Sequence, residues 1–290
     1  MSQTSAARTV TPSACGDDRQ AGTRQVPVDG NAADSDPPGG PRRALDGAAY
    51  AMEGASPHRV GPVSTREANL VRVDPNSLPL VGQGRGCLVY DLGDGTVLRH
   101  YRHPSQCAEA EAAAMRRAAQ AGVPVPQVHA VSNTAIRMDR VDGPTLAEQL
   151  AEHPEEAGAF GRLLADLHHA LDRTRSRGSA LVHGDLHPGN VLMSADGPVL
   201  IDWTNHRIGP RALDVALTWL VLDCFDPDDD ALRAQLAPLR DELLRSFLEA
   251  VDADAAAAAL PEAALIRRAD PSTTSEEHSR IDRLVRVSAS

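Results

Sequence analysis

The sequence predicts an α+β protein in which a small sheet comes first and helices dominate afterwards. Short strand-like segments separated by turn signals lie between residues 78 and 141, and helical apolar periods follow residue 142. The 290 residues suffice for one large domain or two small ones, and an apolar fraction of 42% suffices for a core. Because only 3% of the residues are aromatic, leucine, valine and alanine must fill that core.

Composition divides the chain into four parts. Residues 1–64 are rich in Ala, Gly, Pro, Ser and Asp without an apolar period, so we expect them to be disordered or loosely ordered. Two folded regions follow, 65–141 and 142–268. Residues 269–290 are polar, and we expect a tail that frays.

The first folded region reads as an antiparallel sheet with one helix. The sequence Gly93-Asp94-Gly95 between two strand-like segments is a hairpin signal. An alanine-rich helix is predicted over residues 105–121, where Gly122 and the following prolines end it. The predicted strands are 78–81, 87–92, 96–101, 128–131 and 135–141.

The second folded region begins after Asp142-Gly143-Pro144. Thr145 and Glu148 have the spacing of a capping box, which predicts a short helix. The later predicted helices include an apolar face over 160–171, a segment over 212–222 that is apolar almost all round and therefore buried, and an amphipathic segment over 231–251. A short strand is predicted at 199–202.

Charge and cysteine usage restrict the possible partners and location. The net charge of −11 argues against nucleic acid, because binding to phosphates needs a basic face; solubility explains the acidity equally well. Four scattered cysteines without a C-x-x-C pair argue against a zinc site or disulfide framework. With no secretory start and no apolar run that could span a bilayer, we expect a cytoplasmic protein without a membrane partner.

The segment from residue 181 to 192, with Ile201-Asp202-Trp203 after it, carries the chemistry. Asp185 can orient or deprotonate a hydroxyl, and its alternative role is that of a turn residue beside Gly184. Asn190 and Asp202 offer the oxygen ligands that Mg²⁺ prefers, and Asp202 ends a predicted apolar strand, where an unpaired carboxylate is costly. This set predicts phosphoryl transfer from a nucleotide.

These residues resemble the aminoglycoside phosphotransferase and choline kinase family, whose fold is similar to that of protein kinases. His183-Gly184-Asp185 stands for H-R-D, Asn190 follows at the kinase spacing, and Asp202-Trp203-Thr204 stands where D-F-G would be. The resemblance covers roughly residues 66 to 265. It implies a two-lobed protein-kinase-like fold, with a nucleotide-binding N-lobe (65–141), a catalytic and acceptor-binding C-lobe (142–268), ATP and Mg²⁺.

The resemblance also implies a nucleotide site in the first lobe. Gly82, Gly84 and Gly86 could form the turn over the phosphates, or an ordinary hairpin, because their spacing is not G-x-G-x-x-G. The chain has no lysine, so Arg99 stands where the family usually has one. Its expected partner is Glu111 on the following helix.

Further residues are given roles by the same resemblance. Backbone groups around Met138 and Arg140 are expected to read the adenine edge at the junction between the lobes. Glu109 is the second choice as the partner of Arg99. Asp214 is expected to tie down the catalytic loop.

Four histidines complete the candidate residues. We expect His183 to brace the catalytic loop through hydrogen bonds. His168 and His169 read better as core histidines than as metal ligands. The sequence leaves open whether His187 has a structural role or a role on the substrate side.

The sequence thus predicts a kinase that transfers the γ-phosphate of ATP to a hydroxyl of a small-molecule acceptor. Residues 205–266 carry five arginines and twelve acidic residues, which favours a cationic acceptor such as an aminoglycoside or amino alcohol, or only a solvated loop. Two alternatives remain: a nucleotide-binding pseudokinase scaffold, and a protein kinase, which the short segment after Asp202 disfavours. The oligomeric state and the choice between ATP and GTP stay open.

Overall fold

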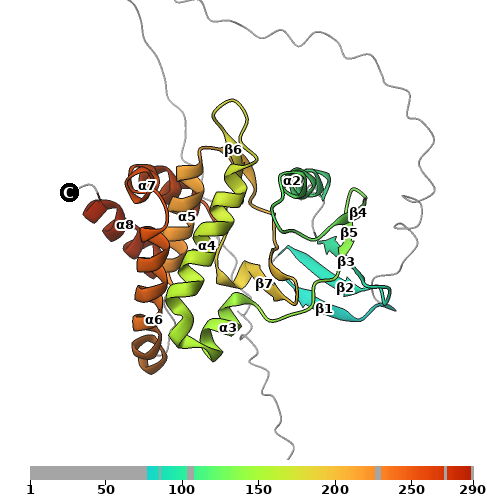
Figure 1. Cartoon of the computed structure of the whole chain (residues 1–290), viewed down its shortest axis with the longest axis horizontal. Helices are drawn as coiled ribbons and strands as arrows, with labels where there is room; N and C mark the ends of the chain where they lie inside the picture. Colours follow the sequence, from blue (N-terminus) through green and yellow to red (C-terminus); the bar gives the residue numbers. More distant parts are fainter. Residues whose placement is uncertain (1–76, 85, 103–107, 226–229, 271–272, 289–290) are drawn as a thin grey trace, which may run out of the picture. The chain divides into compact units, whose positions relative to one another are not determined.

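The computed structural model describes residues 77–84, 86–102, 108–225, 230–270 and 273–288, which all belong to the unit formed by residues 59–290. The expected disordered segment, 1–64, lies outside the described residues. The fold is a two-lobed α+β fold in which an antiparallel sheet with one helix precedes a helical lobe (Figure 1).

The N-lobe is a five-stranded antiparallel sheet with the strand order β1-β2-β3-β5-β4. Helix α2, Ala108–Gln120, packs against β4 and β5. The predicted hairpin is present: Gly93 and Gly95 adopt positive φ angles, and Leu92 N donates to Thr96 O at 3.0 Å. The strands are β1 Leu80–Gln83, β2 Cys87–Asp91, β3 Thr96–Tyr101, β4 Val128–Val131 and β5 Ala135–Asp139.

The C-lobe begins with α3, Leu146–Glu152, which opens with the predicted capping box of Thr145 and Glu148. Gly143 before it is required, because a Cβ there would lie 2.1 Å from Met193 O. Two short strand pairs carry residues 181–192 and their neighbours: β6 Ala180–Val182 with β9 Arg207–Gly209, and β7 Val191–Ser194 with β8 Gly197–Leu200. The 3₁₀ turn η3, Pro188–Asn190, directly precedes β7.

The remaining helices form the body of the C-lobe. They are α4 Ala157–Asp172, α5 Arg211–Cys224, α6 Asp230–Glu249, α7 Ala253–Arg268 and α8 Ser275–Ser288, with the 3₁₀ turn η2 Pro154–Glu156 before α4. Helix α5 is buried along most of its length, as its apolar sequence predicts. Helices α4 and α6 approach closely at Gly161, where a Cβ would lie 2.4 Å from Leu243 O. No helix in the described part of the chain is long and apolar enough to cross a membrane.

The expectation of a frayed polar tail over 269–290 is wrong for residues 275–288. These residues form α8, which packs on α5 and α7 with the side chain of Ile281 fully buried. Ile281, Leu284 and Val285 recur at helical spacing, so one narrow apolar stripe suffices to dock an otherwise polar helix. Helix α7, which the sequence analysis did not predict, lies between α8 and α5 in the same cluster.

Replacing Ile281 with alanine tests the docking of α8. The change removes a fully buried side chain, so the free energy of unfolding should fall by about 2 to 5 kcal/mol in urea titrations. Val287→Ala is the matched control on the same helix, because Val287 is 68% exposed and should change stability by less than about 0.5 kcal/mol. Equal, small effects of both changes would mean that α8 does not stabilise the fold.

Candidate functional site

The catalytic segment leaves β6 at Val182 and turns sharply at Gly184. Gly184 has a φ of +83°, and a Cβ at this position would lie 2.4 Å from Asn205 O. Only glycine fits both requirements. The turn presents Asp185 to a cavity of about 830 Å³ whose walls come from both lobes.

His183 braces this turn, as the sequence analysis expected. The side chain is fully buried, its Nε2 lies 3.1 Å from Ile201 O, and its Nδ1 accepts from Asp185 N at 3.3 Å. Its ring also packs edge-on against Trp203. Burial lowers the pKa of His183, which favours the neutral ring with the proton on Nε2.

Asp214 fixes the same turn from α5, as expected. Its two oxygens accept from His183 N at 3.0 Å and Gly184 N at 2.9 Å. Burial acts to raise the pKa of Asp214, but the hydrogen bonds and charge of its histidine and amide neighbours lower it more, so the net pKa lies below its ordinary value.

A second set of bonds ties the turn to α4. His168 lies in the core, as predicted: its Nε2 lies 3.0 Å from Thr218 Oγ1, and its Nδ1 lies 3.6 Å from Asp214 without a hydrogen bond. Thr218 in turn donates to Leu186 O at 2.8 Å. His169 is exposed on the outer face of α4, so the core role expected for it is wrong.

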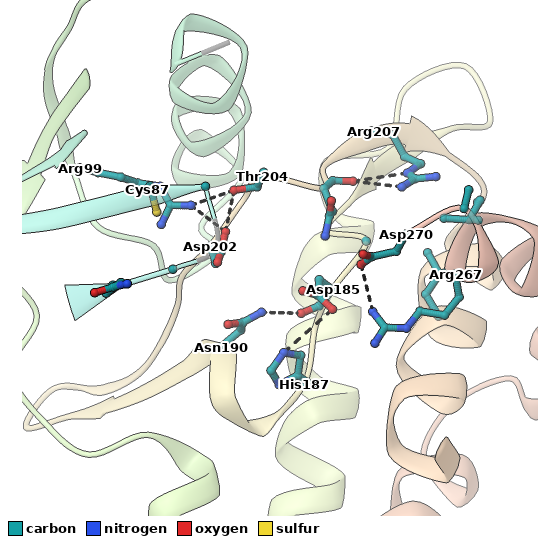
Figure 2. A pocket seen from close by; sticks show the side chains of 18 residues that line it. Cys87, Arg99, Asp185, His187, Asn190, Asp202, Thr204, Arg207, Arg267 and Asp270 are labelled. Carbon is teal, nitrogen blue, oxygen red and sulfur yellow. Dashed lines mark hydrogen bonds and ion pairs between the residues drawn. The ribbon is translucent and has the colours of Figure 1, made fainter. Parts of the chain in front are cut away.

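The two predicted metal ligands line the same cavity as Asp185 (Figure 2). Asn190 Nδ2 donates to Asp185 O at 2.8 Å, which holds the amide at the cavity wall. Asp202 has a φ of +60°, a strained backbone that is typical of functional sites. The structure therefore brings Asp185, Asn190 and Asp202 together.

These residues fit a divalent cation that takes part of its coordination from phosphate oxygens and water. Among the described residues no group of three or more His, Cys, Asp or Glu side chains could hold a metal alone. Asn190 and Asp202 nevertheless supply an amide and a carboxylate oxygen, the donors that Mg²⁺ prefers. The two cavities at the lobe junction are lined by six acidic side chains and four arginines, a net negative charge that favours a bound cation.

Arg99 on β3 connects the two lobes at this point. Its Nε lies 3.1 Å from Glu111 Oε1, the expected partner on α2, while the second choice, Glu109, is exposed. Its Nη2 donates to Asp202 Oδ1 at 2.7 Å and to Thr204 Oγ1 at 2.8 Å. One buried guanidinium thus bridges a carboxylate of each lobe.

The pKa values follow from this arrangement. Burial acts to lower the pKa of Arg99, but Glu111 and Asp202 raise it above its ordinary value. Burial raises the pKa of Glu111, and Arg99 only partly offsets that effect. For Asp202, Arg99 and Thr204 outweigh burial and hold the pKa below its ordinary value.

The three glycines of the expected phosphate loop lie along the hairpin between β1 and β2. Gly84 N donates to Cys87 O at 3.0 Å, which closes the turn. Gly84 and Gly86 line the cavity of Asp185, and Gly82 lines a neighbouring cavity of about 560 Å³. The hairpin therefore lies where a loop over nucleotide phosphates would lie.

The neighbouring cavity extends between the lobes and shares Gln83, Arg99 and Asp202 with the first. Met138 supplies part of its apolar wall from β5. Arg140 also lines it, but Arg140 N already donates to Gly95 O at 3.0 Å and its side chain pairs with Asp91 and Asp142. The amide of Arg140 is therefore engaged within the protein.

Several lining residues were not found from the sequence. Thr204 occupies the place of the glycine in D-F-G, and its hydroxyl donates to Asp202 Oδ1 at 2.7 Å. Its position two residues after Asp202 could have predicted that it lines the site. Arg207 from β9 and Arg267 and Asp270 at the end of α7 lie on the far side of Asp185 (Figure 2). No local pattern marks these three, because the pairing of β9 with β6 brings Arg207 to the cavity and the packing of α7 brings Arg267 and Asp270.

His187 lies at the lower edge of the cavity. Its Nδ1 accepts from Gly189 N at 3.1 Å, and its Nε2 lies 3.9 Å from Asp185 Oδ1. The side chain therefore has a structural bond on one nitrogen and faces the predicted base with the other.

Two family models match parts of this chain. A RIO domain model matches residues 99–213, and a phosphotransferase enzyme family model matches residues 169–263. The two matches overlap over the catalytic segment and Asp202. Each covers less than half of the 290 residues.

The chain is also similar to curated archaeal proteins named probable bifunctional tRNA threonylcarbamoyladenosine biosynthesis protein. The one from Methanospirillum hungatei is 31% identical over 166 residues, which cover 51% of this chain and 30% of that protein. The one from Methanoculleus marisnigri is 26% identical over 174 residues, which cover 52% and 31%. The chain therefore spans about a third of the length of these relatives.

Among solved structures, a thermostable mutant of aminoglycoside phosphotransferase APH(4)-Ia has a TM-score of 0.53 at 16% identity, covering 73% of this chain and 94% of that chain. This similarity shows the kinase-like fold. The resemblance to phosphotransferases is thus supported by a family model and by the fold, while the relatives and the RIO match extend it to a second kinase-like family.

Replacing Arg99 with methionine tests the bridge between the lobes. The change leaves Glu111 buried without its cation, so the free energy of unfolding should fall by about 3 to 5 kcal/mol in denaturant titrations. Arg116→Met, at an exposed position on α2, keeps this network and serves as the control. A loss below about 1 kcal/mol for Arg99→Met would contradict a structural role for the bridge.

Replacing Asp214 with asparagine tests the clamp on the catalytic turn through pH. Because the folded-state pKa of Asp214 lies below its unfolded value, its charge stabilises the fold above that value, and the stabilisation is lost as the pH falls through the folded pKa. The stability difference between wild type and Asp214→Asn should therefore be constant from pH 7 to about 4 and shrink below about 3.8.

Unfolding titrations between pH 3 and pH 7 measure this difference. Asp166→Asn is the matched control, because the Asp166 side chain is 83% exposed. A wild-type advantage that is independent of pH would show that packing around residue 214, and not its charge, holds the turn.

Proposed function

We propose that this protein is an ATP-dependent phosphotransferase that phosphorylates a hydroxyl group of a small molecule. The observation that carries the proposal is the meeting of Asp185, Asn190 and Asp202 in one cavity that continues into a second, nucleotide-sized cavity past Arg99. The kinase-like fold supports the same class of reaction.

The nucleotide would lie across the two cavities. Its base fits the cavity between the lobes, where Val97 and Met138 from the sheet and Leu192 from the C-lobe offer apolar contacts. Its phosphates would lie under the glycine hairpin, near Arg99. Arg99 can neutralise phosphate while it keeps its bond to Glu111, because the guanidinium has separate donor edges.

Asp185, Asn190 and Asp202 each have one role in the proposed reaction. Asp185 accepts the proton of the acceptor hydroxyl as its oxygen bonds to the γ-phosphorus, and the bond to the β-phosphate oxygen breaks to release ADP. Asn190 and Asp202 would hold Mg²⁺, which would neutralise phosphate charge when bound. His183 and Asp214 keep Asp185 in place and do not contact the reacting atoms.

The acceptor side favours a small molecule over a protein. Only residues 203–210 separate Asp202 from α5, and part of that segment pairs with β6 as β9. This leaves little room for the loop with which protein kinases bind peptides. The acidic run expected to attract a cation, 226–230, lies largely outside the described residues, and Arg207 and Arg267 line the acceptor end together with Asp270.

A second candidate function is a role in tRNA threonylcarbamoyladenosine biosynthesis, which the curated relatives and the RIO match favour. In that role the protein would hydrolyse ATP or act as a nucleotide-binding scaffold beside a partner. The net charge of −11 argues against direct contact with tRNA in that case.

The deciding experiment is an acceptor screen with ATP and Mg²⁺ that compares wild type with Asp185→Asn. The variant should lose phosphoryl transfer by about 10²- to 10⁴-fold, because the general base is removed, and should keep its affinity for a non-hydrolysable ATP analogue. Asp166→Asn is the control for the same chemical change at an exposed site. Full activity in Asp185→Asn would refute the assigned base; ATP binding without transfer to any hydroxyl would favour the scaffold.

A further inference from the structure

An apolar groove of about 400 Å³ lies behind the catalytic turn. Its walls are formed by α3, α5 and α6, and its floor by Pro188 and Gly189, which follow Asp185 in the chain. The side chains that line it are almost all aliphatic or aromatic: Ala147, Leu150, Val221, Phe225, Leu236 and Leu239. The groove is thus a concave apolar site, and its volume is typical of small-molecule pockets.

The groove and the catalytic cavity share one lining residue. His187 lines both, and its Nε2 lies 3.9 Å from Asp185 Oδ1. Pro188 and Gly189 lie between the predicted base and the predicted metal ligand Asn190 in the chain. A molecule bound in the groove would therefore lie next to the residues that carry the proposed chemistry.

The groove also has a feature that the fold alone does not explain. Phe225 is 55% exposed at its rim, although α5 before it is buried. An exposed phenylalanine beside half-buried leucines leaves apolar surface in contact with water, which is unfavourable without a ligand. An apolar ligand that covers this surface would gain binding free energy from its burial.

We infer that this groove binds the apolar part of the acceptor, so that the substrate is an alcohol whose hydroxyl is attached to an aliphatic or aromatic body. This inference rests on the proposed function. The hydroxyl reaches Asp185 past His187, while the body lies against Leu150, Leu236 and Leu239. Such a substrate differs from the polar aminoglycosides and sugars that the sequence left open.

The test is a series of neutral primary alcohols, ethanol, 1-butanol and 1-hexanol, offered as acceptors with ATP and Mg²⁺. Burial of each added methylene should raise kcat/KM by about three- to fourfold in the wild type. Leu239→Gln and, from another helix, Leu150→Gln should remove most of this dependence on chain length. Leu265→Gln, at a leucine that is 67% exposed on α7, is the matched control and should keep the full dependence.

Direct binding of 1-hexanol, measured by calorimetry in the presence of a non-hydrolysable ATP analogue, separates the two proposals. Binding that Leu239→Gln weakens about tenfold, without phosphoryl transfer to any alcohol, would support the groove and reject the proposed function. Transfer whose rate is independent of chain length, or is equal in Leu239→Gln, would reject the groove and leave the proposed function standing. A concentration-dependent dimer that Leu239→Gln abolishes, without hexanol binding, would assign the groove to a second copy of the chain and overturn the inference.

Discussion

The geometry of the whole site depends on one buried guanidinium. Arg99 belongs to the sheet of the N-lobe, Glu111 to its helix, and Asp202 to the catalytic segment of the C-lobe, and the bonds of Arg99 hold the three together. A lysine ammonium is a compact point charge, whereas the planar guanidinium offers Nε to one carboxylate and Nη2 to the other. Arginine therefore serves two anions at once, which explains how a chain without lysine can keep this junction. Since its pKa lies above its ordinary value, the bridge remains charged throughout the physiological range.

The catalytic turn, in contrast, is fixed entirely within the C-lobe. Asp214 accepts hydrogen bonds from the backbone amides of His183 and Gly184, and the His183 ring accepts one from the amide of Asp185. Thr218 donates a hydrogen bond to the carbonyl of Leu186. All of these groups are buried, so an unpaired polar atom among them would be costly. Asp185 and Asn190 thus have a rigid support that does not depend on the N-lobe. Only Asp202 is shared, because Arg99 reaches it across the cavity.

The sequence predicted the parts of this arrangement that local patterns specify. The strands over 96–101 and 128–131, the capping box at Thr145 and the buried helix α5 follow from periodicity and caps, and they occur as predicted. Asp185, Asn190 and Asp202 could be proposed as one site because they lie within one short segment, and all three line the same cavity. Arg207 was missed because its place depends on the pairing of β9 with β6, and Arg267 and Asp270 were missed because theirs depends on how α7 packs; no spacing in the sequence encodes either. Helix α8 was missed because a single buried residue, Ile281, supplies much of its apolar contact within a polar stretch.

The contrast between the two sides of Asp185 indicates how such a fold can change its acceptor. On the nucleotide side, Arg99, Asp202 and the glycine hairpin are constrained by each other and by the core, so little can vary there without loss of the site. On the other side, the apolar groove takes its lining from the outer faces of α3 and α6, where half-buried leucines carry no bond that the catalytic turn requires. A substitution among these leucines changes the shape and polarity of the groove at a modest cost in stability. Under the proposed function, acceptor preference can therefore vary on this face while Asp185, Asn190 and Asp202 stay fixed.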